Sequence, residues 1–326
     1  MNKFIVITSV NTASADIKAL SSLFSWKVII IGDKKSQAMQ DTESLTYYSL
    51  EKQSLAGFSL SSKLPFNHYS RKNLGYLLAM QQHASLIYDT DDDNKPLDHF
   101  VWPEFSCSTR LKSNAKFLNV YQHFTDNPVW PRGFPIDQLT GSKTDQNSVD
   151  HHPAEIGVWQ GLVSGEPDVD AIYRLTNNLP VVFENRPPVY LHQDNYCPFN
   201  SQNTLWSRRL FPLMYLPVSV TSRFSDILRS FIAQRLMHEQ HLHLGFISPN
   251  VVQKRNPHHL LKDFKDEYEM YLHTSEIIKL LDEIPAGSDL ISGLQRVYLT
   301  LSRHGFVAAE ENIAVDAWCE DCNRLY

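Results

Sequence analysis

Short apolar runs and polar breaks alternate along the first hundred residues in a pattern typical of an α/β sheet. Residues 4–8 and 27–31 are rich in β-branched side chains, which favours buried strands. Between them, residues 15–24 carry apolar side chains at helical spacing. A strand, a helix and a second strand in this order predict a βαβ unit and therefore a parallel sheet.

The same reading predicts further elements along the rest of the chain. Helices are expected at 70–79, 219–239, 263–281 and 291–301, and strands at 85–87 and 246–252. Residues 94–152 show no clear periodicity, so we expect irregular loops there, of the kind that carry function. With 326 residues, the chain fits one large α/β domain or two smaller ones.

Composition and charge narrow the class of protein. The net charge is −6 and no stripe of Lys and Arg is visible, whereas a nucleic-acid binder normally has a basic face. No apolar stretch reaches the ~20 residues that span a bilayer, and the apolar part of the N-terminus is too short for a secretion signal. We therefore expect a cytoplasmic protein with no nucleic-acid partner and no transmembrane segment, although peripheral association with a membrane stays open.

An acidic run follows the strand expected at 85–87. Asp89, Asp91, Asp92 and Asp93 place four carboxylates within five residues. Carboxylates this close repel one another unless a cation neutralises them. Oxygen ligands suit Mg²⁺, Mn²⁺ or Ca²⁺, and Mg²⁺ is typically held by one or two carboxylates together with the phosphates of a substrate. The run therefore predicts a metal and phosphate site for a nucleotide-linked substrate; the alternative is an acidic, solvated loop.

Two further features fall on the same edge of the expected sheet. Asp33 follows the second strand at its carboxyl end, which is where parallel sheets bind ligands. Arg71 lies at the start of the helix expected at 70–79, and a helix N-terminus with adjacent cations favours anions. Together with the acidic run they would cradle ribose, phosphates and a metal. The alternatives are that Asp33 caps a turn and that Arg71 is a solvated charge.

Several blocks of sequence, in order, resemble those of the STELLO-type glycosyltransferases. The blocks are 67–76 (NHYSRKNLGY), 88–94 (YDTDDDN), 130–135 (WPRGFP) and 166–175 (EPDVDAIYRL). The resemblance covers roughly residues 4–281. A more distant similarity, at 167–171 and 223–226, is to the reversibly glycosylated polypeptides, which are UDP-arabinopyranose mutases.

Both groups imply a GT-A type fold, in which a mixed, mainly parallel sheet flanked by helices binds the nucleotide. We expect a GT-A domain at 1–260, with a donor-binding half at 1–95 and an acceptor half at 96–260, and a helical extension packed on it at 261–326. The resemblance implies a metal-dependent enzyme that moves a sugar from a nucleotide-sugar donor to a glycan or another hydroxyl acceptor, in polysaccharide biosynthesis. The alternatives are a mutase acting on nucleotide sugars and a non-catalytic partner of a polysaccharide synthase.

In GT-A enzymes, a DxD motif holds a divalent cation, Mn²⁺ or Mg²⁺, that bridges the donor diphosphate. The resemblance implies Asp91 and Asp93 as the metal pair, with Asp89 as a competing first member because two registers fit the motif. A late histidine commonly supplies a third ligand in this fold. His258 is the candidate here, and a surface position is its alternative.

The remaining candidates surround the donor. They are Thr8, Asp33, Arg71, Asn73, Asp89, Asp92 and Asn203. Arg71 and Asn73 resemble donor-contacting residues of related transferases. The amide of Asn203 is of a type that donates to and accepts from sugar hydroxyls, although a polar turn would also explain it.

Transfer with inversion needs a general base that deprotonates the acceptor hydroxyl. By resemblance, Asp226 is the first candidate. We expect it in the first turn of the helix at 219–239, where capping alone would also favour an aspartate. Asp168 and Asp170 are the second candidates, and their alternative is a turn after Pro167.

Overall fold

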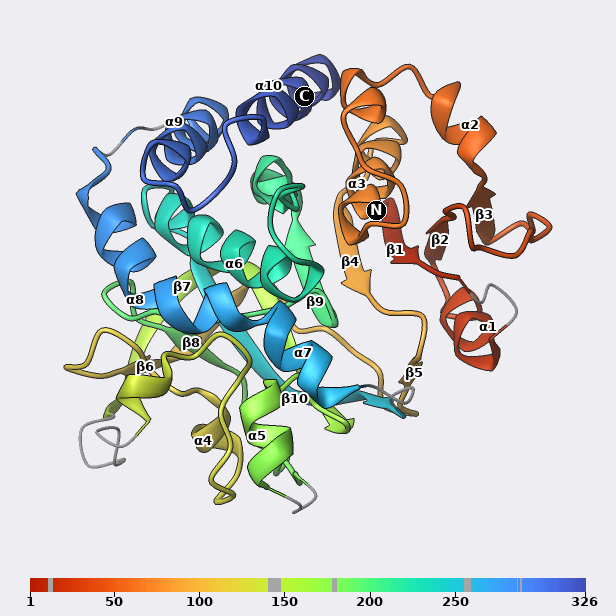
Figure 1. Cartoon of the computed structure of the whole chain (residues 1–326). Coiled ribbons are helices and arrows are strands. Elements are labelled where there is room, and N and C mark those ends of the chain that lie inside the picture. Colours follow the sequence, from red (N-terminus) through yellow and green to blue (C-terminus); the bar gives the residue numbers. More distant parts are fainter. Residues whose placement is uncertain (11–13, 140–147, 178–180, 255–258, 286, 288) are drawn as a thin grey trace.

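The computed structural model of the chain describes residues 1–326 apart from 11–13, 140–147, 178–180, 255–258, 286 and 288. Within the described residues, ten strands form one sheet in the order β3-β2-β1-β4-β9-β7-β6-β8-β10-β5 (Figure 1). The strands are β1 Lys3–Thr8, β2 Trp26–Ile31, β3 Leu45–Tyr48, β4 Leu86–Thr90, β5 Asn94–Pro96, β6 Ser106–Lys112, β7 Ser148–Gly165, β8 Val189–Leu191, β9 Asn203–Ser207 and β10 His243–Gln253. The helices are α1 Ala15–Ser21, α2 Leu50–Ser54, α3 Lys72–Gln81, α4 Tyr121–Phe124, α5 Ala171–Thr176, α6 Ser222–His238, α7 Leu260–Asp266, α8 Tyr268–Glu283, α9 Leu290–Arg303 and α10 Glu311–Leu325.

The N-terminal part of the sheet is parallel. Strands β3, β2, β1 and β4 pair side by side in the same direction, with α1 connecting β1 to β2. Helix α3 lies directly on β1, because a side chain at Gly75 would come within 2.4 Å of the Val6 Cγ1 atom. The predicted βαβ unit and parallel pairing are confirmed, and the pairing brings the carboxyl ends of β1, β2 and β4 together.

The rest of the sheet mixes both directions. Strand β9 runs antiparallel to β4 and to β7, and β10 runs parallel to β7. The predicted α/β class, a mixed sheet with flanking helices, is confirmed. The β4–β9 pairing joins the segment predicted as the donor half to the segment predicted as the acceptor half. That division stays a prediction, since one sheet passes through both segments.

The segment expected to be irregular, 94–152, contains more regular structure than its pattern indicated. It holds β5, β6 and α4, and β7 begins within it. Strand β6 is polar and only Leu111 of it is buried, so it carries no alternation of apolar and polar residues that would predict a strand. The single helix expected at 263–281 is two helices, α7 and α8.

The C-terminal helix α10 packs against α3 and α9 and contacts two segments that are distant in the sequence (Figure 1). The Asp321 carboxylate accepts the backbone N–H groups of Ser59 and Leu60, each at 2.9 Å. The buried Glu311 carboxylate accepts the hydroxyl of Tyr215 at 2.6 Å and the backbone N–H of Ser219 at 2.7 Å. The second contact fixes the loop that leads into α6.

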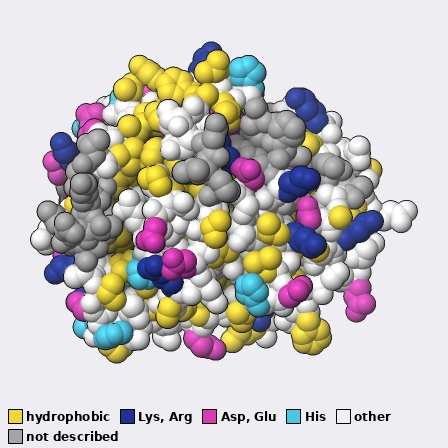
Figure 2. Space-filling view, turned by 90° about the horizontal axis from the view of Figure 1, so that it is seen from below, with side chains coloured by type: hydrophobic (Ala, Val, Ile, Leu, Met, Phe, Trp, Pro, Cys, Tyr) yellow, Lys and Arg dark blue, Asp and Glu magenta, His cyan; other side chains and the backbone are white. Residues whose placement is uncertain are grey.

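Charged side chains of both signs are interspersed on the face seen from below (Figure 2). Hydrophobic side chains also reach this face at several places. Among the described helices, none has the length and apolar character needed to cross a membrane.

Candidate functional site

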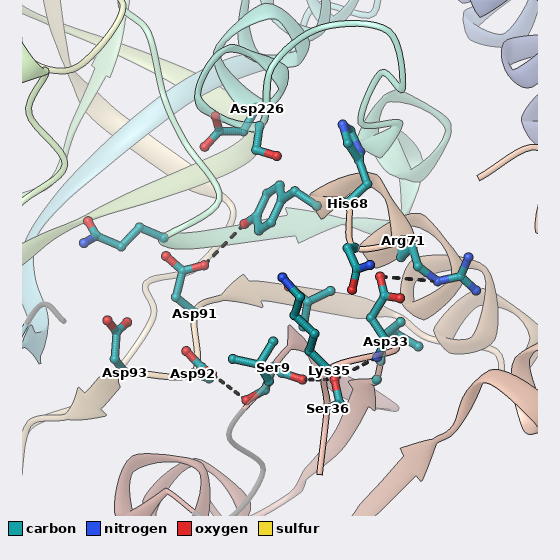
Figure 3. A pocket seen from close by; sticks show the side chains of 18 of the residues that line it. Ser9, Asp33, Lys35, Ser36, His68, Arg71, Asp91, Asp92, Asp93 and Asp226 are labelled. Carbon is teal, nitrogen blue, oxygen red and sulfur yellow. Dashed lines mark hydrogen bonds and ion pairs between the residues drawn. The ribbon is translucent and has the colours of Figure 1, made fainter. Parts of the chain in front are cut away.

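A cavity of about 540 Å³ lies at the carboxyl ends of β1, β2 and β4 (Figure 3). On the sheet side, its described lining includes Thr8, Ser9, Asp33, Lys35, Ser36, Asp91, Asp92 and Asp93. On the opposite side, it includes Arg132, Asp168, Ser222, Arg223 and Asp226. The structure thus brings Asp33 and part of the acidic run to one edge of the sheet, as the expected parallel βαβ unit predicts.

The acidic run divides where β4 ends. Asp89 is still inside the strand and fully buried, and it pairs with two equally buried cations. Its carboxylate lies 2.7 Å from Lys72 Nζ and 2.9 Å from Arg229 Nη1. It is not among the described residues that line the cavity. Because its charge is already balanced inside the protein, this placement does not favour Asp89 as a donor contact or as the first residue of the DxD motif, and that role stays a prediction.

The three carboxylates beyond β4 all reach the cavity, and each accepts a hydrogen bond from an uncharged side chain (Figure 3). The bonds are Tyr69 Oη to Asp91 at 3.3 Å, Ser9 Oγ to Asp92 at 2.5 Å and Gln253 Nε2 to Asp93 at 2.6 Å. Of the two registers, Asp91-Asp92-Asp93 is the one that faces the cavity.

Negative charge is in excess around these carboxylates. Burial raises the pKa of Asp91 to about 8, and the neighbouring carboxylates raise it further against Lys72, whose amine is 3.9 Å away. Burial also raises the pKa of Asp92. When all four carboxylates of the run are ionised, Lys72 and Arg229, among the described residues, offset two of the four negative charges. One divalent cation would balance the remaining two.

The donor atoms fit a hard cation such as Mg²⁺ or Mn²⁺, since they are carboxylate oxygens. Within the part of the chain that the structure describes, no three His, Cys, Asp or Glu side chains gather as a ready metal site. A cation would therefore need phosphate or water oxygens beside Asp91 and Asp93. His258, the expected third ligand, lies outside the described residues.

The opposite wall is built around Arg132, which is bonded to two carboxylates. Its guanidinium donates to Asp168 at 2.7 and 2.9 Å and to Asp226 at 2.9 and 3.0 Å. Burial lowers the pKa of Arg132, but the negative charges of Asp168 and Asp226 outweigh this effect and raise it. Asp226 also accepts the backbone N–H groups of Ser201 and Ile227, at 3.1 and 3.0 Å. Four hydrogen bonds therefore converge on the Asp226 carboxylate.

Asp226 lies one turn later in its helix than expected. Helix α6 begins at Ser222, so Asp226 is its fifth residue and belongs to the second turn. Helix capping therefore does not explain the aspartate, whereas the contact with Arg132 does.

Asp170 is the N-cap of α5 and is not among the described residues of the cavity. Its carboxylate accepts the Tyr173 N–H at 2.7 Å and the Trp130 indole N–H at 2.6 Å. Burial raises its pKa to about 6. Both oxygens thus serve the local structure, so this placement does not favour the catalytic role expected for Asp170, which stays a prediction.

Asn73 and Asn203 are also buried outside the cavity lining. Asn73 exchanges two hydrogen bonds of 2.8 Å with the backbone of Leu216. Asn203 accepts from Tyr88 Oη at 2.9 Å and donates to Asn250 at 2.8 Å, within the centre of the sheet. Both amides join segments of the fold, so this placement does not favour the expected donor contacts, which stay predictions.

Arg71, Asp33 and Thr8 do line the cavity. The Arg71 Nε atom donates to Gln53 at 3.1 Å and lies 4.0 Å from the Asp33 carboxylate. Arg71 is buried and paired, so it is not the solvated charge of the alternative reading.

Several residues of the described lining were not candidates from the sequence, among them Lys35, Arg132 and Gln253. Two of them could have been found from the sequence. Arg132 belongs to the WPRGFP block that carries the resemblance, and Lys35 follows the candidate Asp33 by two residues. Gln253 had no such signal, because it reaches the site through the pairing of β10 with the distant strand β7.

Comparison with known proteins agrees with the resemblance. The sequence model of the STELLO glycosyltransferases matches residues 223–325. Probable glycosyltransferase STELLO2 from Arabidopsis thaliana is 27% identical over an alignment that covers 98% of this chain, and Probable glycosyltransferase STELLO1 is 26% identical over 98%. The chain is STELLO-like. This STELLO-like chain spans 44% of the length of either plant protein, which is less than half.

Solved structures show only a slight likeness to the STELLO-like chain. Glucosyl-3-phosphoglycerate synthase from Mycobacterium tuberculosis, in complex with phosphoglyceric acid, has a TM-score of 0.36 and 11% identity. The same enzyme with Mn²⁺, UDP-glucose and phosphoglyceric acid has a TM-score of 0.37 and 10% identity. Each match covers 88% of this chain and 81% of the other.

Proposed function

We propose that the STELLO-like chain is a metal-dependent glycosyltransferase that moves a sugar from a nucleotide-sugar donor to a hydroxyl group of a glycan or another acceptor. The observation that carries the proposal is the division of the acidic run. Asp89 is balanced inside the protein, whereas Asp91 and Asp93 face a cavity at the ligand-binding edge of a parallel sheet. The similarity to the STELLO proteins supports the same class of reaction.

In this proposal, Asp91 and Asp93 hold Mn²⁺ or Mg²⁺. The bound cation would neutralise negative charge on the donor diphosphate, which is where charge develops as the sugar leaves. Asp33, Arg71, Thr8 and Asp92 are the proposed contacts of the nucleotide, since all four line the same end of the cavity.

The reaction forms a bond between the acceptor oxygen and the anomeric carbon of the sugar. The bond from that carbon to the phosphate oxygen breaks, and its electron pair stays on the nucleoside diphosphate. The acceptor proton must pass to a general base. Asp226 and Asp168 are the proposed bases, since both line the cavity, and both also hold Arg132 in place.

A thermal-shift screen of nucleoside diphosphates and nucleotide sugars, with and without Mn²⁺, tests the proposal. Ligands that bind only the folded state raise the melting temperature by mass action. We expect a Mn²⁺-dependent rise for one nucleotide with the wild-type protein and none with the double variant Asp91→Asn, Asp93→Asn.

Asp98→Asn is the matched control, since this aspartate is exposed and outside the cavity lining. It should keep the full shift. A shift that persists in the double variant would disprove the assigned metal site. No shift with any nucleotide would instead favour a non-catalytic partner of a polysaccharide synthase.

A further inference from the structure

Most of the positive side chains that line the cavity are already paired within the protein. Among the described lining residues the cations are Lys35, Arg71, Arg132 and Arg223. Arg71 is bonded to Gln53, Arg132 to two carboxylates and Arg223 to Glu267. Lys35 is the exposed member of this described set and shows no such pairing. Its charge is therefore available to a ligand.

The turn that carries Lys35 is fixed to the acidic run through two serines. Ser36 Oγ accepts the Asp33 N–H at 2.7 Å and donates to the Ser9 carbonyl oxygen at 2.5 Å. Ser9 in turn donates its hydroxyl to Asp92 at 2.5 Å. The Lys35 side chain extends from this turn into the cavity, between the side of Asp33 and the side of Asp91 (Figure 3). The backbone that places the amine is thus tied to the proposed metal site.

The charge balance of the cavity explains why a further cation is needed. One divalent cation would offset the two negative charges that the protein leaves on the acidic run. A nucleotide sugar then brings a diphosphate with negative charges of its own. Charged hydrogen bonds to phosphate are among the stronger ones, and an ammonium group supplies three donors.

We infer that Lys35 binds the diphosphate of the donor and stabilises the leaving nucleoside diphosphate from the sheet side of the cavity, between Asp33 and Asp91. This inference rests on the proposed function. As the bond to the anomeric carbon breaks, its electron pair moves onto a phosphate oxygen, and the Lys35 ammonium group donates a hydrogen bond to the diphosphate that gains this charge.

Lys34 provides an internal control. It has the same charge and is the preceding residue, but it is not among the described cavity residues. Its amine instead lies 4.2 Å from the centroid of the Phe66 ring. A general effect of removing one positive charge from this loop would therefore appear equally in both lysine variants.

The experiment measures binding of inorganic pyrophosphate, in the presence of Mn²⁺, by titration calorimetry. Pyrophosphate carries the diphosphate without a base or sugar, so the identity of the donor does not matter. We expect Lys35→Met to weaken binding about tenfold, as for the loss of one charged hydrogen bond. Lys34→Met should stay within about twofold, and Lys35→Arg should recover most of the affinity.

Each outcome separates the inference from the proposed function. Wild-type affinity in Lys35→Met, or equal weakening in Lys34→Met, overturns the inference and leaves the proposed metal site standing. No Mn²⁺-dependent binding of pyrophosphate or of any nucleoside diphosphate to the wild type overturns both. Because Lys35 is exposed, the variants should keep the wild-type melting temperature; Lys35→Gln replaces the methionine variant if they do not.

Discussion

Two groups of carboxylates face each other across the cavity, and the protein treats their charges in opposite ways. Asp168 and Asp226 share one guanidinium, and their side chains are only 8% and 6% exposed. Asp91, Asp92 and Asp93 lie beside uncharged partners, and Asp91 is 34% exposed. Asp168 and Asp226, whose charges Arg132 balances, form a fixed wall of the cavity. The excess negative charge of Asp91, Asp92 and Asp93 favours the binding of a cation.

The largest effect is expected when the balanced wall loses its cation. Arg132→Met would leave Asp168 and Asp226 buried without their partner, and such losses cost about 3–5 kcal/mol. Urea unfolding should show that decrease in the free energy of unfolding. An unchanged value would mean that the two carboxylates gain no stability from Arg132, and the comparison would fail.

A second change tests the same contrast within the acidic run itself. Asp89→Asn would leave Lys72 and Arg229 buried without their counter-charge and should lower the free energy of unfolding by about 3 kcal/mol. Asp91→Asn, two residues later, should leave it unchanged at neutral pH, where Asp91 still holds its proton, and raise it above about pH 8, where the change removes repulsion. Equal destabilisation by both changes would contradict the division of the run at the end of β4.

The pH dependence of metal binding should follow the raised pKa of Asp91. A proton occupies this carboxylate until the pH reaches about 8, so Mn²⁺ must compete with it below that value. We expect the affinity for Mn²⁺ to rise about tenfold per pH unit up to about 8. Without metal, the folded state holds the proton more tightly than the unfolded state, so this group's contribution to stability falls as the pH rises from 3.8 to about 8.

Calorimetric titrations at several pH values would measure the metal affinity, and urea unfolding without metal would measure the stability. In the Asp91→Asn variant, both the Mn²⁺ affinity and the free energy of unfolding should depend less on pH. A pH-independent Mn²⁺ affinity in the wild type would show that Asp91 is not a metal ligand.

The smallest expected effect concerns the uncharged ties of the acidic run. Ser9→Ala removes the hydroxyl that donates to Asp92 and should cost about 1 kcal/mol in the free energy of unfolding. Ser21→Ala, whose hydroxyl bonds an exposed carbonyl of Lys18, should cost less than about 0.5 kcal/mol. If Ser9→Ala lowered the free energy of unfolding as much as Arg132→Met, the contacts of the acidic run would be as important for stability as those of Arg132, which contradicts the comparison.

The parallel half of the fold could be predicted from the sequence because its signals are local. The strands β1 and β2 are continuous apolar runs, and a helical period separates them, so the edge that holds Asp33 follows directly. The position of Asp91 and Asp93 in the cavity also follows from the strand that precedes them. The polar strand β6 had no such local signal and could not be found this way.

The roles of single polar residues could not be predicted, because they depend on pairings between distant segments. Asn73 and Asn203 have the chemistry of sugar ligands, yet their partners, the backbone of Leu216 and the side chain of Asn250, lie far along the chain. Asp89 and Asp91 are alike in sequence, and only the buried position of Lys72 and Arg229 separates them.

The contact between Glu311 and the loop before α6 has a consequence for the whole chain. That loop is held by Glu311 at Ser219 and by Asn73 at Leu216, so it connects the last helix to the first turn of α3 and to the start of α6. The loop at 216–219 therefore links the elements on both sides of the cavity to α10. By thermodynamic reciprocity, a nucleotide that orders those walls should also protect the amides of α10 from exchange with deuterium, far from the bound ligand.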